Sequence, residues 1–261
     1  MITGIDHIVI MVSDLETAAS TWGELGFTVV PGGKHPRGTH NALVAFQDGS
    51  YLELIAFWEP DYDAHRWHRF QNTGAGLIDH ALGSDDLARE LEALRERGIA
   101  YNGPNPGARS RPDGVQLEWR TAHPAGISDH GLPFLIDDIT DRSLRVPHGD
   151  DARHANGVTG IDRLQVLVAD LATTGATYAQ LLDQEAPEPV LSEEAGEPTQ
   201  CISLRAGPHT IEIHQPEGNG ELAERITRFG DGPLAVRFTA SQALEVAPET
   251  IDGARISAIA R

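Results

Sequence analysis

Cysteine is nearly absent from this sequence: Cys201 is the single one among 261 residues, so no disulfide can form within the chain. Long apolar runs are absent too, and none approaches the roughly 20 residues of a membrane span. The first residues lack the charged start and apolar core of a signal peptide. A reducing compartment is the simplest setting for such a chain. We therefore expect a cytoplasmic protein with no membrane partner.

Positive charge is also scarce. The chain has 20 lysine and arginine residues against 39 aspartate and glutamate residues, which gives a formal net charge of −19. Such a charge repels phosphate backbones and anionic lipid surfaces. It argues against general nucleic-acid binding and leaves a small molecule as the expected partner.

A strand-and-helix pattern opens the chain and is then repeated. The stretch GIDHIVIMVSDLETA starts at Gly4, and the near copy GIDRLQVLVADLATT starts at Gly160. The β-branched run predicts a strand, and Ser13 followed by Glu16 has the spacing of a capping box at the start of a helix. A short strand over 27–33 and a hairpin of 40–47 with 50–57 complete a β-α-β-β-β unit.

Three further units follow the same order. The second has a strand over 76–83, a helix over 84–98 and extended segments at 99–103, 114–122 and 131–138. The third begins at Gly160, and the fourth begins at 232 and is abbreviated. Residues 141–157 have no apolar period, so we interpret them as an interdomain linker, with His148 and His154 as surface histidines.

These units predict an α+β fold in which paired βαβββ modules form a curved mixed-sheet cup. One unit has a single helix to cover its sheet, whereas two units side by side build a sheet whose other face lines a cleft. The expected domains are 1–140, with two modules, a linker over 141–157, and a degenerate, truncated half over 158–261.

Three side chains in the first two units are candidates for a metal site. His7 lies on one face of the first strand with Ile5, Val9 and Met11, and His80 occupies the equivalent position of the second unit. Glu53 stands in the middle of an apolar strand, where an unpaired charge would be costly. Two imidazoles and a carboxylate suit a divalent metal such as Zn, Fe, Mn or Ni. The alternative is a hydrogen-bonded polar cluster without metal.

The stretches GIDHIVIMVSDLETAASTWGELGF and GSYLELIAF resemble the vicinal oxygen chelate superfamily of glyoxalase I, extradiol dioxygenases and bleomycin-resistance proteins. Within it, the chain is similar to glyoxalase-like domain proteins, and PGARSRPDGVQLEWR and GLPFLI extend the resemblance. The resemblance implies metal ligands on the first and last strands of paired units, here His7, Glu53 and His80. The fourth position falls on Phe134, which cannot bind a metal and speaks against a glyoxalase I reaction.

The resemblance implies a metal-dependent enzyme acting on a small substrate with vicinal oxygens, either a lyase or isomerase or an extradiol-type dioxygenase. A metal-free binding protein like the bleomycin-resistance proteins is the alternative. A third hypothesis is an interaction module whose cleft is filled by its own side chains, namely Met11, Tyr51, Trp119 and Phe134. No catalytic residue is assigned. Loose acid–base candidates are His40, His123 and His130, and Glu118 is either a base or fourth ligand or a surface glutamate. Whether the chain forms a homodimer is an open question at this point.

Two arginine pairs remain. Arg109 and Arg111 lie in the loop-like stretch GARSRPDG, where they either anchor an anionic substrate or pair with surface carboxylates. Arg163 and Arg237 replace the histidines in the second half, and Glu212 is expected to pair with one of them. Because two arginines cannot bind a cation, we expect the second half to be a structural or docking domain.

Overall fold

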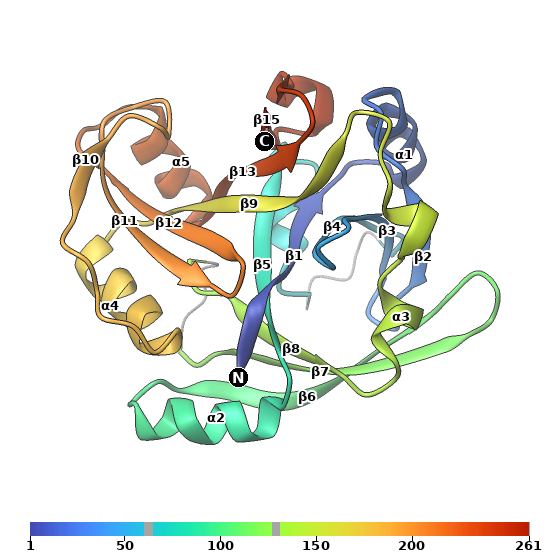
Figure 1. Ribbon diagram of the computed structural model, residues 1–261, viewed down its shortest axis with the longest axis horizontal. Coiled ribbons are helices and arrows are strands. Elements are labelled where there is room, and N and C mark those ends of the chain that lie inside the picture. The colour runs from blue at the N-terminus through green and yellow to red at the C-terminus, as the bar shows by residue number, and fades with distance from the viewer. Residues whose placement is uncertain (60–64, 127–130, 261) are drawn as a thin grey trace.

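The first two units fold as the predicted modules. The computed structural model describes residues 1–59, 65–126 and 131–260 (Figure 1). The first module contains β1 (Ile2–Met11), α1 (Leu15–Glu24), β2 (Val30–Lys34), β3 (Thr39–Ala45) and β4 (Tyr51–Phe57). After the 3-10 turn η1 (His68–Phe70), the second contains β5 (Leu77–Ser84), α2 (Leu87–Glu96), β6 (Tyr101–Ser110), β7 (Gln116–Pro124) and β8 (Phe134–Asp138).

Aspartate caps the first helix of each module. The carboxylate of Asp14 accepts a hydrogen bond from the backbone N–H of Thr17, and Asp86 caps α2 in the same way. An aspartate oxygen satisfies one of the backbone donors that have no partner in the first turn of a helix. The predicted cap at Ser13 is therefore wrong by one residue. Ser13 instead binds the side chain of Asp252 near the other end of the chain.

The predicted cup closes into a complete barrel. Its strand order is β1-β4-β3-β2-β6-β7-β8-β5, so each module contributes four neighbouring strands. The modules meet along the antiparallel pair β1 and β5 and again where Lys34 of β2 pairs with Ser110 of β6. Alternate side chains of a closed barrel point inward. The two copies of the unit therefore enclose a space between them.

The second half repeats the scaffold but stays open. It consists of β9 (Val158–Leu167), α4 (Leu171–Leu181), β10 (Val190–Ser192), β11 (Thr199–Ala206), β12 (His209–Pro216), α5 (Glu221–Phe229), β13 (Gly232–Ala240), β14 (Leu244–Glu245), η3 (Pro248–Ile251) and β15 (Arg255–Ala260). Its seven strands form one sheet in the order β10-β11-β12-β9-β13-β15-β14. The abbreviated fourth unit supplies too few strands for closure, which confirms a degenerate second half.

The two halves share one apolar core. In Figure 1 the second sheet lies beside β1 and β5, on the outside of the barrel. Ile8 and Leu82 of these strands belong to the same buried cluster as Tyr178, Ile211 and Phe238 of the second half. The outward faces of β1 and β5 are thus covered by the second half, while their inward faces line the barrel.

The segment predicted as a linker carries structure of its own. It contains α3 (Arg142–Arg145) and the 3-10 turn η2 (Gly149–Ala152). Its His148 is exposed, as expected, but the expectation is wrong for His154, which is buried and accepts a hydrogen bond from the backbone N–H of Thr28. Within the described ranges, no helix combines the length and apolar character that crossing a membrane requires.

Arg145 is the residue of this segment on which the barrel depends. Its Nη1 and Nη2 each lie 2.9 Å from one oxygen of Asp6 in β1, and Nη2 also binds Asp138 at 2.9 Å. Arg145 and Asp6 are 3% and 2% exposed. A buried carboxylate is tolerated in such a place because the forked guanidinium neutralises it with two parallel hydrogen bonds.

We expect Arg145→Gln to lower the free energy of unfolding by about 3–5 kcal/mol, because it removes the buried cation that bonds both oxygens of the buried Asp6 carboxylate and leaves only the more exposed Arg142 beside it. Arg153→Gln is the matched control, since Arg153 pairs with Asp150 at the surface, where the two side chains are 72% and 92% exposed. Urea unfolding at pH 7 measures both. Equal, small losses in the two variants would contradict the role given to Arg145.

Candidate functional site

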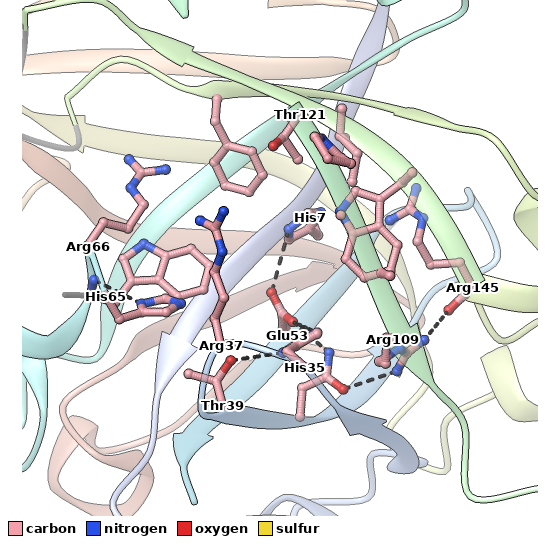
Figure 2. A pocket seen from close by; sticks show the side chains of 18 of the residues that line it. His7, His35, Arg37, Thr39, Glu53, His65, Arg66, Arg109, Thr121 and Arg145 are labelled. Atoms are coloured by element: carbon pink, nitrogen blue, oxygen red, sulfur yellow. Dashed lines mark hydrogen bonds and ion pairs between the residues drawn. The ribbon is translucent and has the colours of Figure 1, made fainter. Parts of the chain in front are cut away.

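A cavity of ≈330 Å³ lies inside the barrel. Its walls come from β1, β3, β4, β6, β7 and β8 and from the segments that follow β2 and β4. Figure 2 shows the Glu53 carboxylate at its centre, near His7 and His35. Apolar and aromatic side chains form part of the wall, among them Leu43, Tyr51, Trp67, Trp119, Phe134 and Ile136. The cavity is therefore a small apolar chamber with a polar centre, the usual composition of a small-molecule site.

Three side chains surround the Glu53 carboxylate. The Nδ2 of Asn41 donates to Oε1 at 2.6 Å, His7 Nε2 lies 3.6 Å from Oε2, and His35 Nε2 lies 3.9 Å from Oε1. The Glu53 side chain is only 8% exposed. The structure thus places three polar side chains around the buried carboxylate, and His7 is one of them.

A β-bulge at Asp6 orients the His7 ring. Ile5 pairs with Leu82 and His7 pairs with Ala81, so Asp6 is an extra residue in β1. Its Oδ1 lies 2.6 Å from His7 Nδ1. Burial alone would raise the pKa of Asp6, but the charge of Arg145, the hydrogen bond with His7 and the charge of Arg142 hold that pKa well below its usual range. An ionised Asp6 accepts a hydrogen bond from Nδ1–H, which leaves Nε2 facing Glu53.

The same bulge removes His80 from the site. Because of the extra residue, His80 pairs with Ile8 instead of His7 and shares the outward face of the barrel with it. Its Nε2 lies 2.7 Å from the hydroxyl of Tyr178 in α4, with the two rings nearly parallel. The predicted convergence of His7, Glu53 and His80 is therefore not found, since His80 is part of the core between the two halves.

The residues at the site do not match the metal centre that the superfamily implies. Phe134, at the predicted fourth position, lies edge-on to the His7 ring at 5.3 Å and offers no ligand atom. In the part of the chain that the structure describes, no group of three or more histidine, cysteine, aspartate or glutamate residues is arranged to hold a metal ion. His7 and Glu53 alone remain from the predicted set of three.

The two arginines of GARSRPDG have different surroundings. Arg109 is 3% exposed and lies within β6, so the prediction that it stands in a loop is wrong. Its Nη1 donates to Oδ1 of Asn41 at 3.0 Å, which connects it to Glu53 through the amide. Burial lowers the pKa of Arg109. Arg111 does not line the cavity and pairs with Asp113 at 2.8 Å. This matches the alternative in which the arginine pairs with a surface carboxylate.

The cavity also contains residues that the sequence did not single out. They are His35 and Arg37 after β2 and His65 and Arg66 after β4, in stretches with no periodicity, and all four line the cavity. Burial lowers the pKa of His35 to about 4, and burial likewise lowers that of His65 to about 4. Both imidazoles are therefore neutral at pH 7 and act as hydrogen-bonding groups.

Three further candidates can now be placed. His123 lines the cavity and stacks on Phe134 at 5.4 Å, whereas His40 does not line it and Glu118 is exposed. His130 lies outside the described residues. Tyr51, Trp119 and Phe134 form walls and leave the chamber open, and Met11 packs in an apolar cluster with Ile55, so these side chains do not fill the cleft.

A family model described as a glyoxalase-like domain matches residues 5–182, more than half of the chain. The chain belongs to this glyoxalase-like family, within the vicinal oxygen chelate superfamily. The match spans both barrel modules, the segment that carries Arg145, and β9 with α4 of the second half. No curated protein sequence matches the chain significantly.

Several solved structures share the fold of this glyoxalase-like protein. A hypothetical protein from Staphylococcus aureus superposes with a TM-score of 0.73 at 15% identity, covering 98% of this chain and 99% of its own. A mutant of 4-hydroxymandelate synthase from Streptomyces coelicolor gives 0.61 at 16% identity, covering 93% and 72%. A xylose isomerase-like TIM barrel/4-hydroxyphenylpyruvate dioxygenase fusion protein gives 0.54 at 17% identity, covering 93% and 37%. At these identities the likeness is one of fold.

We expect stability to fall as the pH drops from 6.5 to about 4, because the unfolded chain binds a proton at His35 in this window and the folded chain does not. The slope from one such group is at most about 1.4 kcal/mol per pH unit. His35→Gln should flatten the pH dependence of the glyoxalase-like protein in urea unfolding. The control is His148→Gln at the surface. An unchanged slope in His35→Gln would show that burial of this ring is not the cause.

Proposed function

We propose that this glyoxalase-like protein binds a small organic acid in its barrel and transfers a proton on it, with no metal ion. The observation that carries the proposal is that one chamber contains arginines together with two acceptor atoms, on His7 and Glu53, that have no donor between them among the described residues. Arg37, Arg66 and Arg109 stand among the residues that line it, and Arg109 is buried and hydrogen-bonded to Asn41. Guanidinium groups bind carboxylates through two parallel hydrogen bonds, so a carboxylate is the ligand group that they favour.

The proton chemistry follows from His7 and Glu53. A proton on His7 Nδ1, bound to Asp6, leaves a lone pair at Nε2, and the Glu53 carboxylate offers another at Oε2. The 3.6 Å between these atoms is too long for a hydrogen bond, and both are acceptors. A ligand hydroxyl or an acidic C–H between them supplies the missing donor. His7 then takes the proton, and the carboxylate of Asp6 stabilises the imidazolium that forms.

The ligand class follows from the two kinds of polar group in the chamber. The arginines favour a carboxylate, and the space between His7 and Glu53 favours a hydroxyl or an acidic C–H. Small 2-hydroxy and 2-oxo acids combine both, and the cavity of ≈330 Å³ is in the range of a small organic molecule. Proton removal next to a carbonyl makes isomerase or lyase chemistry the expected reaction type.

A series of 2-hydroxy and 2-oxo acids, titrated while the fluorescence of Trp67 and Trp119 is followed, tests this proposal. We expect binding of an acid and no binding of its amide. Arg66→Gln should weaken binding about tenfold or more, because a hydrogen bond to a charged group contributes about 1.5–3 kcal/mol. Arg111→Gln, at the surface turn, should bind as the unchanged protein does. Equal binding of acid and amide would refute the carboxylate assignment.

The metal-dependent reaction that the superfamily implies is the second candidate, whether of the lyase, isomerase or dioxygenase type. The observation in its favour is that His7 and Glu53, two of the three expected ligands, both face the chamber. These two residues would hold a divalent ion only if the ligand or water supplied the remaining positions, because His80 is turned away.

Equilibrium dialysis against Zn, Fe(II), Mn and Ni separates the two candidates. The metal-free proposal expects less than one equivalent of any of these ions bound at micromolar concentration. Its control is Glu53→Gln, which keeps the size of the side chain and removes its charge. One equivalent of an ion that is lost in Glu53→Gln would establish the metal enzyme and overturn the metal-free proposal.

A further inference from the structure

The open sheet of the second half carries a groove of ≈540 Å³. It lies over β9, β13 and β15 and is bordered by the connection between β10 and β11. Three arginines from three different strands, Arg163, Arg237 and Arg255, line it together with Gln165 and Glu194. This face corresponds to the inner face of the barrel, because β9 takes the place of β1 and β13 that of β5 in the strand order.

The groove repeats the polar centre of the barrel with one change. Ile161 pairs with Phe238 and Arg163 with Arg237, so Asp162 is an extra residue in β9, as Asp6 is in β1. Arg163 therefore occupies the place of His7. Glu212 pairs with Gln165 on β9, as Glu53 pairs with Val9 on β1.

This register corrects one sequence assignment and confirms another. Arg237 stands opposite Arg163 and so takes the place of Ala81, whereas the sequence put it at the place of His80. The predicted pairing of Glu212 with an arginine is confirmed, and its partner is Arg163.

Two like charges are held side by side here. Arg163 and Arg237 pair directly across antiparallel strands, an arrangement that is destabilising unless anions separate the charges. The sheet itself supplies two carboxylates, Glu212 to Arg163 and Asp162 to the Nε of Arg237 at 3.2 Å. In the described part of the chain, the buried Nε of Arg163 still has no hydrogen-bond acceptor. The sheet's own carboxylates thus leave one donor of the pair unsatisfied.

The third carboxylate comes from outside the sheet. Glu194 belongs to the connection between β10 and β11, and its side chain is 54% exposed. Its Oε2 lies 2.9 Å from Nη1 of Arg163 and 3.5 Å from Nη1 of Arg237. An exposed ion pair of this kind contributes little to stability, so the carboxylate of Glu194 can be exchanged for another one at small loss.

We propose that this groove is a second binding site, specific for a small dicarboxylate, and that Glu194 occupies its anion position when no ligand is bound. One ligand carboxylate takes the place of Glu194 between Arg163 and Arg237. The other reaches Arg255, which lies along β15 next to these residues, is 37% exposed and has Glu221 as a distant partner at 3.8 Å. The Glu194 side chain then turns to solvent.

Isothermal titration calorimetry with succinate tests the proposal on the full chain. All variants carry Arg66→Gln, which weakens any binding of succinate in the barrel. Removing the competing charge with Glu194→Gln should tighten succinate binding about three- to fivefold, the factor expected for loss of an exposed ion pair. Glu193→Gln is the matched control, since it removes the same charge from the neighbouring exposed position, and it should leave the affinity unchanged.

Arg237→Gln and Arg255→Gln should each abolish the succinate signal, with circular dichroism confirming that both variants are folded. Because Arg255 is at the rim, its variant remains informative even if loss of Arg237 disturbs the sheet. Absence of succinate binding in both the Arg66→Gln protein and Glu194→Gln would overturn the proposal, and so would equal tightening in Glu193→Gln and Glu194→Gln. Because every variant carries the same barrel, the differences between variants report the groove whether or not the barrel binds an organic acid.

Discussion

The extra residue Asp6 in β1 is the constraint on which the site depends. A single inserted position sets which side chains of β1 and β5 face the cavity, because side chains alternate along a strand. It places His7 inside the barrel and His80 outside it. The carboxylate that the bulge buries is then compensated by Arg145, which arrives from a segment more than a hundred residues further along the chain.

The second half shows that this arrangement is a property of the scaffold. Asp162 forms the same bulge in β9, and Glu212 occupies the same place as Glu53. What differs is the residue between the two acids, an imidazole in the barrel and a guanidinium in the open sheet. An imidazole has a nitrogen that can accept a proton, whereas a guanidinium only donates hydrogen bonds and keeps its charge. In our proposals the imidazole of the barrel accepts a proton and the arginines of the open sheet hold anions.

Much of the fold could be predicted from the sequence, because it follows from patterns among neighbouring residues. The copied strand-helix stretches at Gly4 and Gly160, the hairpin turn at Asp48 and the apolar alternation each depend on neighbouring residues. The pairing of His7 with Glu53 could also be expected, since both stand on strands of one module. His80 could not be placed, because a bulge is a property of two paired strands and leaves no mark in the periodicity of either one.

The remaining site residues could not be predicted from the sequence, for a related reason. His35, Arg37 and Arg66 stand in segments without periodicity, and only the closed barrel brings them to one cavity. Arg109 was assigned to a loop because glycine and proline surround it, although β6 continues through Ser110. Closure and strand pairing are long-range features, and the composition of a short stretch does not report them.

The position of Arg145 has a consequence for dissecting the molecule. A fragment that ends at the predicted boundary after residue 140 contains every barrel strand but loses the only two arginines, Arg142 and Arg145, that contact Asp6 among the described residues. Truncation there would leave the Asp6 carboxylate buried in the barrel wall without either of these arginines. An autonomous N-terminal fragment must therefore extend past α3, so the structural unit is longer than the set of strands that defines its shape.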